Sequence, residues 1–132
     1  MLPPRAEYHL NARSGGLFGI EWTINGEVFR HDSHSGAHVH KGTPIPLGAW
    51  SKLKFTNDSA RLHPMHIHGL FFKLLTRNGQ PVDEPFWRDT VLLKAKETVE
   101  VGTVPLEEGS WMMHCHILEH AESGMMTLLE VR

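Results

Sequence analysis

The feature that most constrains this chain is the segment 111–126, in which metal-binding side chains stand at close spacing. It contains the only cysteine of the sequence, Cys115, with His120 five residues and Met125 ten residues further on. One loop can therefore present a thiolate, an imidazole and a thioether. A blue-copper electron-transfer site uses one Cys, two His and a weak axial Met. The segment predicts a copper site that lacks one imidazole.

A second segment, His-Pro-Met-His-Ile-His-Gly at 63–69, supplies more imidazoles. The whole chain has 11 histidines among 132 residues, and three of them fall within these seven positions. We expect the two segments to form the metal-bearing edge of one β domain.

The spacing within the two segments sorts their ligands onto two faces. Along a β-strand, neighbouring side chains point to opposite faces and residues two apart share a face. Each segment has a pair of histidines two residues apart, and Cys115 lies between the members of its pair. His63 is an odd number of residues from the nearest pair and so shares a face with Cys115. The predicted sets are His63, Cys115, His120 and Met125 on one face, and His66, His68, His114 and His116 on the other. Their shared backbone offers an electron a short covalent path.

The rest of the chain reads as short strands separated by turns, which favours an antiparallel Greek-key sandwich or barrel. Asn25-Gly26 and Asn78-Gly79 are typical of tight hairpin turns. Pro44 and Pro46 favour extended edge structure, and residues 30–42 read as a loop. We expect strands at 7–12, on both sides of Asn25-Gly26 within 19–29, and at 49–57, 66–76, 90–93, 98–101, 111–116 and 126–131. No amphipathic helix is expected, and the length fits a single all-β domain over 1–132.

Composition narrows the function further. The formal net charge of -2 gives no basic surface for nucleic acid. No apolar run approaches the roughly 18 residues of a membrane span, and the first residues lack the apolar core of a signal peptide. We therefore expect no membrane partner. One cysteine makes no internal disulfide, which leaves metal binding or a reactive thiol.

The two segments resemble the C-terminal cupredoxin domain of multicopper oxidases, the laccase and copper-efflux oxidase family. That family carries His-Pro-x-His-x-His-Gly and His-Cys-His followed by His and Met. The resemblance extends to residues 23–26, 87–90 and 109–111. It implies a cupredoxin-like β-sandwich, copper as cofactor, and a periplasmic or secreted location. It also implies a type 1 (blue) copper held by His63, Cys115, His120 and Met125, and half of an oxygen-reducing trinuclear copper site held by His66, His68, His114 and His116.

The chain departs from the family pattern in one respect. In the family, the other half of the trinuclear site comes from two His-x-His motifs of a separate N-terminal cupredoxin domain, which this sequence does not contain. The chain is then an excised domain, or a partner cupredoxin domain completes the site, or two or more copies face each other as a homo-oligomer. A closed two-fold pairing buries the same patch on both protomers and would bring four imidazoles from each.

These features lead to two hypotheses of function. The first is a copper-dependent oxidoreductase in which a small-molecule, metal-ion or protein donor reduces the blue copper and dioxygen is reduced at the shared site. The second is an electron-transfer or copper-binding cupredoxin with only the type 1 site in use. An isolated domain that binds copper weakly, or a copper-free relic, is a third possibility. The sequence does not identify the electron donor.

Other metal sites fit the pattern less well. Residues 116–120 also match the His-x-x-Glu-His pattern of inverted zinc proteases, which requires a helix. His66 and His68 could belong to a cupin site, but no carboxylate follows closely. His31, His34, His38 and His40 are expected in a solvated loop, with a cation at an oligomer contact as the alternative.

Several neighbours of the two segments are assigned lesser roles. Glu119 and Glu122 are read as exposed carboxylates, with proton relay as the alternative. Asp89 is expected to accept a structural or ligand-supporting hydrogen bond. Four methionines fill the core: Met65, Met112, Met113 and Met126.

Overall fold

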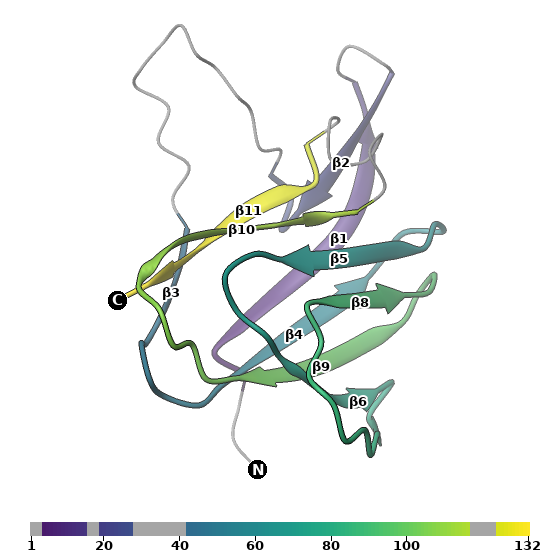
Figure 1. Cartoon of the computed structure of the whole chain (residues 1–132). Coiled ribbons are helices and arrows are strands. Elements are labelled where there is room, and N and C mark those ends of the chain that lie inside the picture. Colours follow the sequence, from purple (N-terminus) through teal and green to yellow (C-terminus); the bar gives the residue numbers. More distant parts are fainter. Residues whose placement is uncertain (1–3, 16–18, 28–41, 117–123) are drawn as a thin grey trace, which may run out of the picture.

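The computed structural model describes residues 4–15, 19–27, 42–116 and 124–132. Within these residues the chain is all-β, which confirms the predicted fold class (Figure 1). No helix in these ranges is long and apolar enough to cross a membrane. The strands are β1 (Ala6–Ser14), β2 (Ile20–Ile24), β3 (Thr43–Ile45), β4 (Ser51–Asn57), β5 (His63–Ile67), β6 (Lys73–Arg77), β7 (Gln80–Pro81), β8 (Thr90–Leu93), β9 (Thr98–Thr103), β10 (Gly109–Cys115) and β11 (Met126–Val131).

The strands form two sheets around one hydrophobic core. The first sheet has the order β2-β1-β4-β9-β6-β7, and the second has the order β3-β11-β10-β5-β8. Pairing is antiparallel except for β1 with β4 and β3 with β11. Strand β4 shows how the core forms, because its residues alternate between fully buried Leu53 and Phe55 and the half-buried Lys52 and Lys54. The two sheets thus turn one apolar face toward each other.

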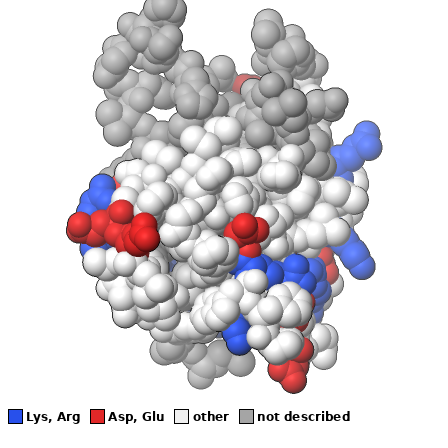
Figure 2. Space-filling view, in the orientation of Figure 1, with Lys and Arg blue, Asp and Glu red and all other residues white. Residues whose placement is uncertain are grey.

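Charged side chains are sparse on one side of the molecule. In the orientation of Figure 1, most of the described surface is neither acidic nor basic (Figure 2). Lys and Arg lie in small groups at the left and right edges of this view and in its lower middle, mostly near Asp and Glu.

Two of the expected strands take a different form. The segment predicted as one strand over 66–76 is divided between the sheets, because β5 ends at Ile67 and β6 begins at Lys73. Gly69, with φ of 79°, lies in the connection, where a positive φ is easy only for glycine. The Asn25-Gly26 turn is present with both φ values positive. However, β2 pairs with β1. Beyond the turn Ile24 and Glu27 form an isolated bridge, and the rest of the expected second strand, at 28–29, lies outside the described residues.

Gly69 also fits closely under the indole ring of Trp111. A Cβ at position 69 would lie 2.0 Å from Trp111 Cδ2. The Trp111 ring is held in turn by a hydrogen bond from its Nε1 to the carbonyl of Glu107 at 3.1 Å. The glycine therefore fixes where the chain leaves β5, directly after His68.

Gly69→Ala is expected to destabilise the metal-free protein by about 2–4 kcal/mol, combining overpacking with the cost of a left-handed backbone. Gly79→Ala is the matched control, because Gly79 has φ of 78° and a Cβ added there would meet nothing within 4 Å. It should cost only about 1–2 kcal/mol. Urea unfolding of both variants measures the difference, and equal losses would show that contact with Trp111 is unimportant.

Candidate metal centre

Strands β5 and β10 lie side by side and carry the two ligand segments. They pair antiparallel, with His114 opposite His66 and Cys115 opposite Met65. The pairing continues past both strand ends, since the His68 amide donates to the Met112 carbonyl at 2.8 Å and the His116 amide donates to the Pro64 carbonyl at 2.6 Å. This fixed register determines which side chains share a face.

On the inner face of this sheet, His63 and Cys115 come together. Both are fully buried, and His63 Nδ1 lies 3.6 Å from Cys115 Sγ. The indole ring of Trp22 packs edge-on against the His63 imidazole, with 5.2 Å between ring centroids. The geometry suits a shared metal ion, because metal–sulfur and metal–nitrogen bonds of about 2.3 and 2.0 Å spanning this gap would meet at about 110°. That angle is compatible with a near-trigonal Cys-His site.

Met125 lies beside Cys115, whereas His120 is outside the described residues. The Cys115 amide donates to the Met125 carbonyl at 3.1 Å, and Met125 is fully buried. Three of the four predicted type 1 ligands are therefore described: the side chains of His63 and Cys115 are in contact, and the backbone of Met125 is hydrogen-bonded to that of Cys115. A soft thiolate with an imidazole and a thioether is a donor set that suits copper.

On the outer face of the same sheet, four imidazoles form a cluster. Their neighbouring ring centroids are 4.5 Å apart for His66 and His68, 5.1 Å for His68 and His114, and 6.2 Å for His114 and His116. His68 Nε2 and His114 Nε2 are 3.0 Å apart. Two metal–nitrogen bonds of about 2.0–2.1 Å drawn from these atoms would meet at about 95°.

Backbone carbonyls determine which ring nitrogen two of these histidines present. His66 Nδ1 lies 3.0 Å from the Asp89 carbonyl oxygen, and His114 Nδ1 lies 2.9 Å from that of Cys115. A carbonyl oxygen only accepts, so both Nδ1 atoms carry the proton and both Nε2 atoms keep a lone pair. Supporting hydrogen bonds of this kind are typical of metal-ligating histidines. Asp89 is a hydrogen-bond acceptor as predicted, because its carbonyl accepts from His66 Nδ1 and its carboxylate Oδ1 accepts the Thr90 hydroxyl proton at 2.9 Å.

The surroundings of His68 favour its neutral form. Partial burial, then the nearby His66 and His114 imidazoles, lower the pKa of His68. A neutral imidazole is the form that binds metal. In the ranges that the structure describes, no three His, Cys, Asp or Glu side chains converge on one point that could hold a metal ion. The outer cluster thus offers single and paired nitrogens that need ligands from elsewhere.

An apolar hollow begins at Gly69, the residue that follows His68. It encloses about 570 Å³ and is lined mainly by residues 69–71, Trp87 and Leu106. Phe71, Trp87 and Leu106 are exposed by 63, 52 and 81%. Exposed apolar groups that gather in one place are typical of interaction surfaces.

The remaining predicted residues divide into those the structure describes and those it does not. Met65 and Met113 are fully buried, as expected for core residues, while Met112 and Met126 are half-buried. His31, His34, His38, His40, Glu119 and Glu122 lie outside the described residues, as does most of the 116–120 zinc-protease pattern. The residue that the sequence did not reveal is Ser59, whose hydroxyl lies 2.8 Å from His63 Nε2.

Comparison with known proteins gives the same family throughout. The family model described as multicopper oxidase matches residues 2–132. The multicopper oxidase MmcO of Mycobacterium tuberculosis is 32% identical over 96% of this chain and 23% of its own length. Among solved structures, a multicopper oxidase from Campylobacter jejuni superposes with a TM-score of 0.76 at 26% identity, over 99% of this chain and 31% of that one. McoA from Aquifex aeolicus gives a TM-score of 0.75 at 28% identity, over 96% and 29%.

These comparisons bear on fold and cofactor. The fold is the expected cupredoxin-like one, and the chain spans less than a third of the length of the relatives just named. Copper is the cofactor that this family uses. Because the family model covers nearly the whole chain, the chain belongs to the multicopper oxidase family.

Proposed function

We propose that this chain is the cupredoxin unit of a multicopper oxidase that both receives electrons and helps to reduce dioxygen. His63, Cys115, His120 and Met125 would hold the type 1 copper, and His66, His68, His114 and His116 would provide half of the trinuclear site. When bound, these coppers would supply one-electron transfer at the first site and reduction of dioxygen to water at the second.

One observation supports this function above all. Consecutive residues of β10 face opposite sides of the sheet, with Cys115 against His63 inside and His114 against His68 outside. The Cys115 backbone thus joins the two clusters directly, and its carbonyl also accepts the His114 Nδ1 proton. The electron donor that reduces the type 1 copper would be a small molecule, a metal ion or a protein.

The outer cluster requires a partner cupredoxin domain or a second copy of the chain. His68 and His114 alone would give one metal ion two nitrogen ligands, fewer than the four of a typical closed site. The exposed apolar hollow beside Gly69 gives such a partner a surface to cover.

The competing function is a plain electron-transfer cupredoxin. Its support is that the side chains of His63 and Cys115 are fully buried and in contact within one chain, with Met125 beside them. Under this function only the type 1 copper would bind.

Copper analysis of the purified protein separates the two. The oxidase assembly should bind more than one copper per chain and show type 2 and type 3 signals with the blue band. One copper per chain with the blue band alone, in a protein that stays monomeric by light scattering at every copper load, would favour electron transfer.

A further inference from the structure

Hydrogen bonds to backbone groups determine which end of the Asn57 side-chain amide is the oxygen and which is the nitrogen. This residue ends β4 and is fully buried. Its Nδ2 donates to the carbonyls of Arg61 at 2.7 Å and Lys94 at 3.0 Å, and its Oδ1 accepts the Ser59 amide proton at 3.0 Å. Carbonyls only accept and amide N–H groups only donate, so the two ends of the amide cannot be exchanged.

Asn57 in turn fixes the hydroxyl proton of Ser59. Ser59 Oγ lies 2.7 Å from Asn57 Oδ1, the usual length of an O–H···O bond, and 3.1 Å from the Arg61 carbonyl. Both of these atoms only accept, and a serine hydroxyl has one proton to give. Once the proton is donated to Asn57, Ser59 Oγ acts toward other neighbours as an acceptor, and it accepts the Arg61 amide at 3.3 Å.

His63 must therefore be the donor in its bond to Ser59. With His63 Nε2 2.8 Å from Ser59 Oγ, the proton resides on Nε2 and the Nδ1 lone pair faces Cys115 Sγ at 3.6 Å. The outer histidines show the opposite arrangement, since His66 and His114 use Nδ1 as donor. The two faces of the sheet thus present different ring nitrogens.

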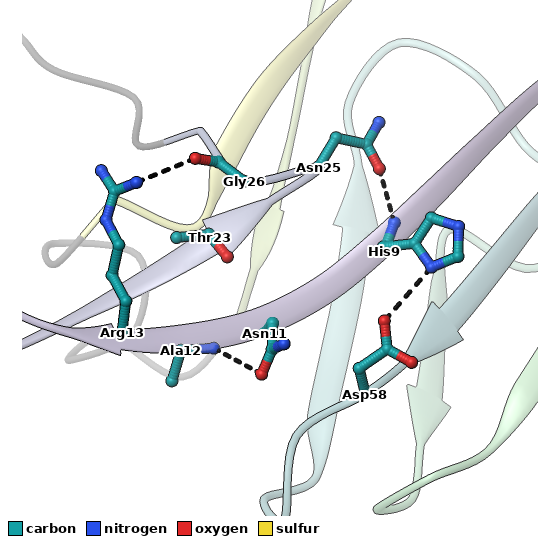
Figure 3. A pocket seen from close by; sticks show the side chains of 8 residues that line it. All are labelled: His9, Asn11, Ala12, Arg13, Thr23, Asn25, Gly26 and Asp58. Carbon is teal, nitrogen blue, oxygen red and sulfur yellow. Dashed lines mark hydrogen bonds and ion pairs between the residues drawn. The ribbon is translucent and has the colours of Figure 1, made fainter.

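The loop that carries Ser59 is anchored independently of these contacts. The Asp58 amide donates to the Leu10 carbonyl at 2.8 Å, and the Asp58 carboxylate lies 3.2 Å from His9 Nδ1 (Figure 3). Lys96 Nζ donates to the Asp58 carbonyl. Ser59 is held from β1 and from the β8–β9 connection, so its position does not depend on a metal.

We propose that Asn57 and Ser59 are positioning residues that lock His63 in the Nε2–H tautomer and so aim Nδ1 at the metal. The tautomer of His63 follows from hydrogen bonds alone, and only its effect on copper rests on the proposed type 1 site. An acceptor on Nε2–H makes the imidazole a stronger donor, which favours cupric over cuprous copper. The pair would thereby set both copper affinity and reduction potential.

The first test uses the metal-free protein. Nitrogen-15 NMR of the wild type should show His63 with a protonated Nε2 and an unprotonated Nδ1, and His66 and His114 with the reverse pattern. A protonated Nδ1 on His63 would overturn the proposal, whether or not the protein binds copper. Failure of the wild type to bind copper would count against the proposed function alone.

The second test compares Ser59→Ala with Ser51→Ala. Ser51 is a second buried serine, at the start of β4, and its hydroxyl has no hydrogen-bond partner among the described residues. Ser59→Ala should lose the single His63 tautomer, bind cupric copper about 10–100-fold more weakly and have a higher reduction potential. A tenfold loss confined to the cupric form corresponds to about 59 mV. Ser51→Ala should change neither the affinity for cupric copper nor the reduction potential, and His63 should keep its single tautomer.

Ser59→Thr keeps the hydroxyl and should restore the wild-type tautomer and potential, which a purely structural role of Ser59 does not predict. If Ser59→Ala does not fold, Ser59→Thr and the wild-type tautomers still decide the question. Unchanged tautomer and potential in folded Ser59→Ala would refute the lock.

Discussion

Cys115→Ser is expected to abolish the intense visible absorption of the copper-loaded protein. The band of a blue-copper site depends on the thiolate ligand, and serine supplies no sulfur. Cys115 is fully buried and its Sγ lies 3.6 Å from His63 Nδ1. Because the sequence has only one cysteine, no other thiol of the chain can take its place. Absorption spectra at matched copper content measure the loss, which should be essentially complete.

The matched control is Met113→Leu. Met113 is fully buried on the same strand and the same face as Cys115, but it is not a predicted ligand. A swap of similar volume in the core usually costs less than about 1.5 kcal/mol, so the variant should fold and stay blue. Thermal unfolding of the metal-free variants checks that both are native. If Cys115→Ser kept the colour, the assignment of the type 1 site would be wrong.

The double variant His68→Ala/His114→Ala is expected to stop dioxygen reduction while leaving the blue band intact. The two Nε2 atoms lie 3.0 Å apart on the outer face, and the type 1 residues lie on the inner face. Loss of residues that only support a ligand costs about 10–100-fold, so loss of two ligands should reduce oxygen uptake by more than about 100-fold. Oxygen consumption and the visible spectrum are measured on the assembly that consumes oxygen.

Gln80→Ala serves as the control for this double variant. Gln80 is exposed on β7, at the edge of the first sheet, whereas β5 and β10 belong to the second sheet. Its removal should leave both oxygen uptake and colour unchanged. Simultaneous loss of colour and oxygen uptake in the double variant would show that the two faces are not separate sites.

Strand periodicity was sufficient to predict the two opposed faces. The placement of His63 with Cys115, and of His66 with His114, depends only on alternation along β5 and β10 and on the pairing of those strands. The point where β5 ends was not predictable, because residues 70–75 continue an apolar pattern and the turn depends on Trp111 covering Gly69. That contact joins residues far apart in the sequence.

The hydrogen bonds around the ligands were also beyond the sequence. Ser59 belongs to no motif, and its importance comes from a loop whose shape depends on contacts with Leu10, Arg61 and Lys94. The acceptor for His66 turned out to be a main-chain carbonyl, which any residue at position 89 could provide. Periodicity predicts faces, whereas tautomers depend on tertiary contacts.

The register of β10 against β5 has a consequence for altered chains. Because side chains alternate, deleting or inserting one residue within β10 ahead of His114 would send the sulfur outward and an imidazole inward. A change of two residues would restore the original sides but move every donor about 7 Å along the strand. Length variation within β10 would therefore exchange or displace the donors of both sites.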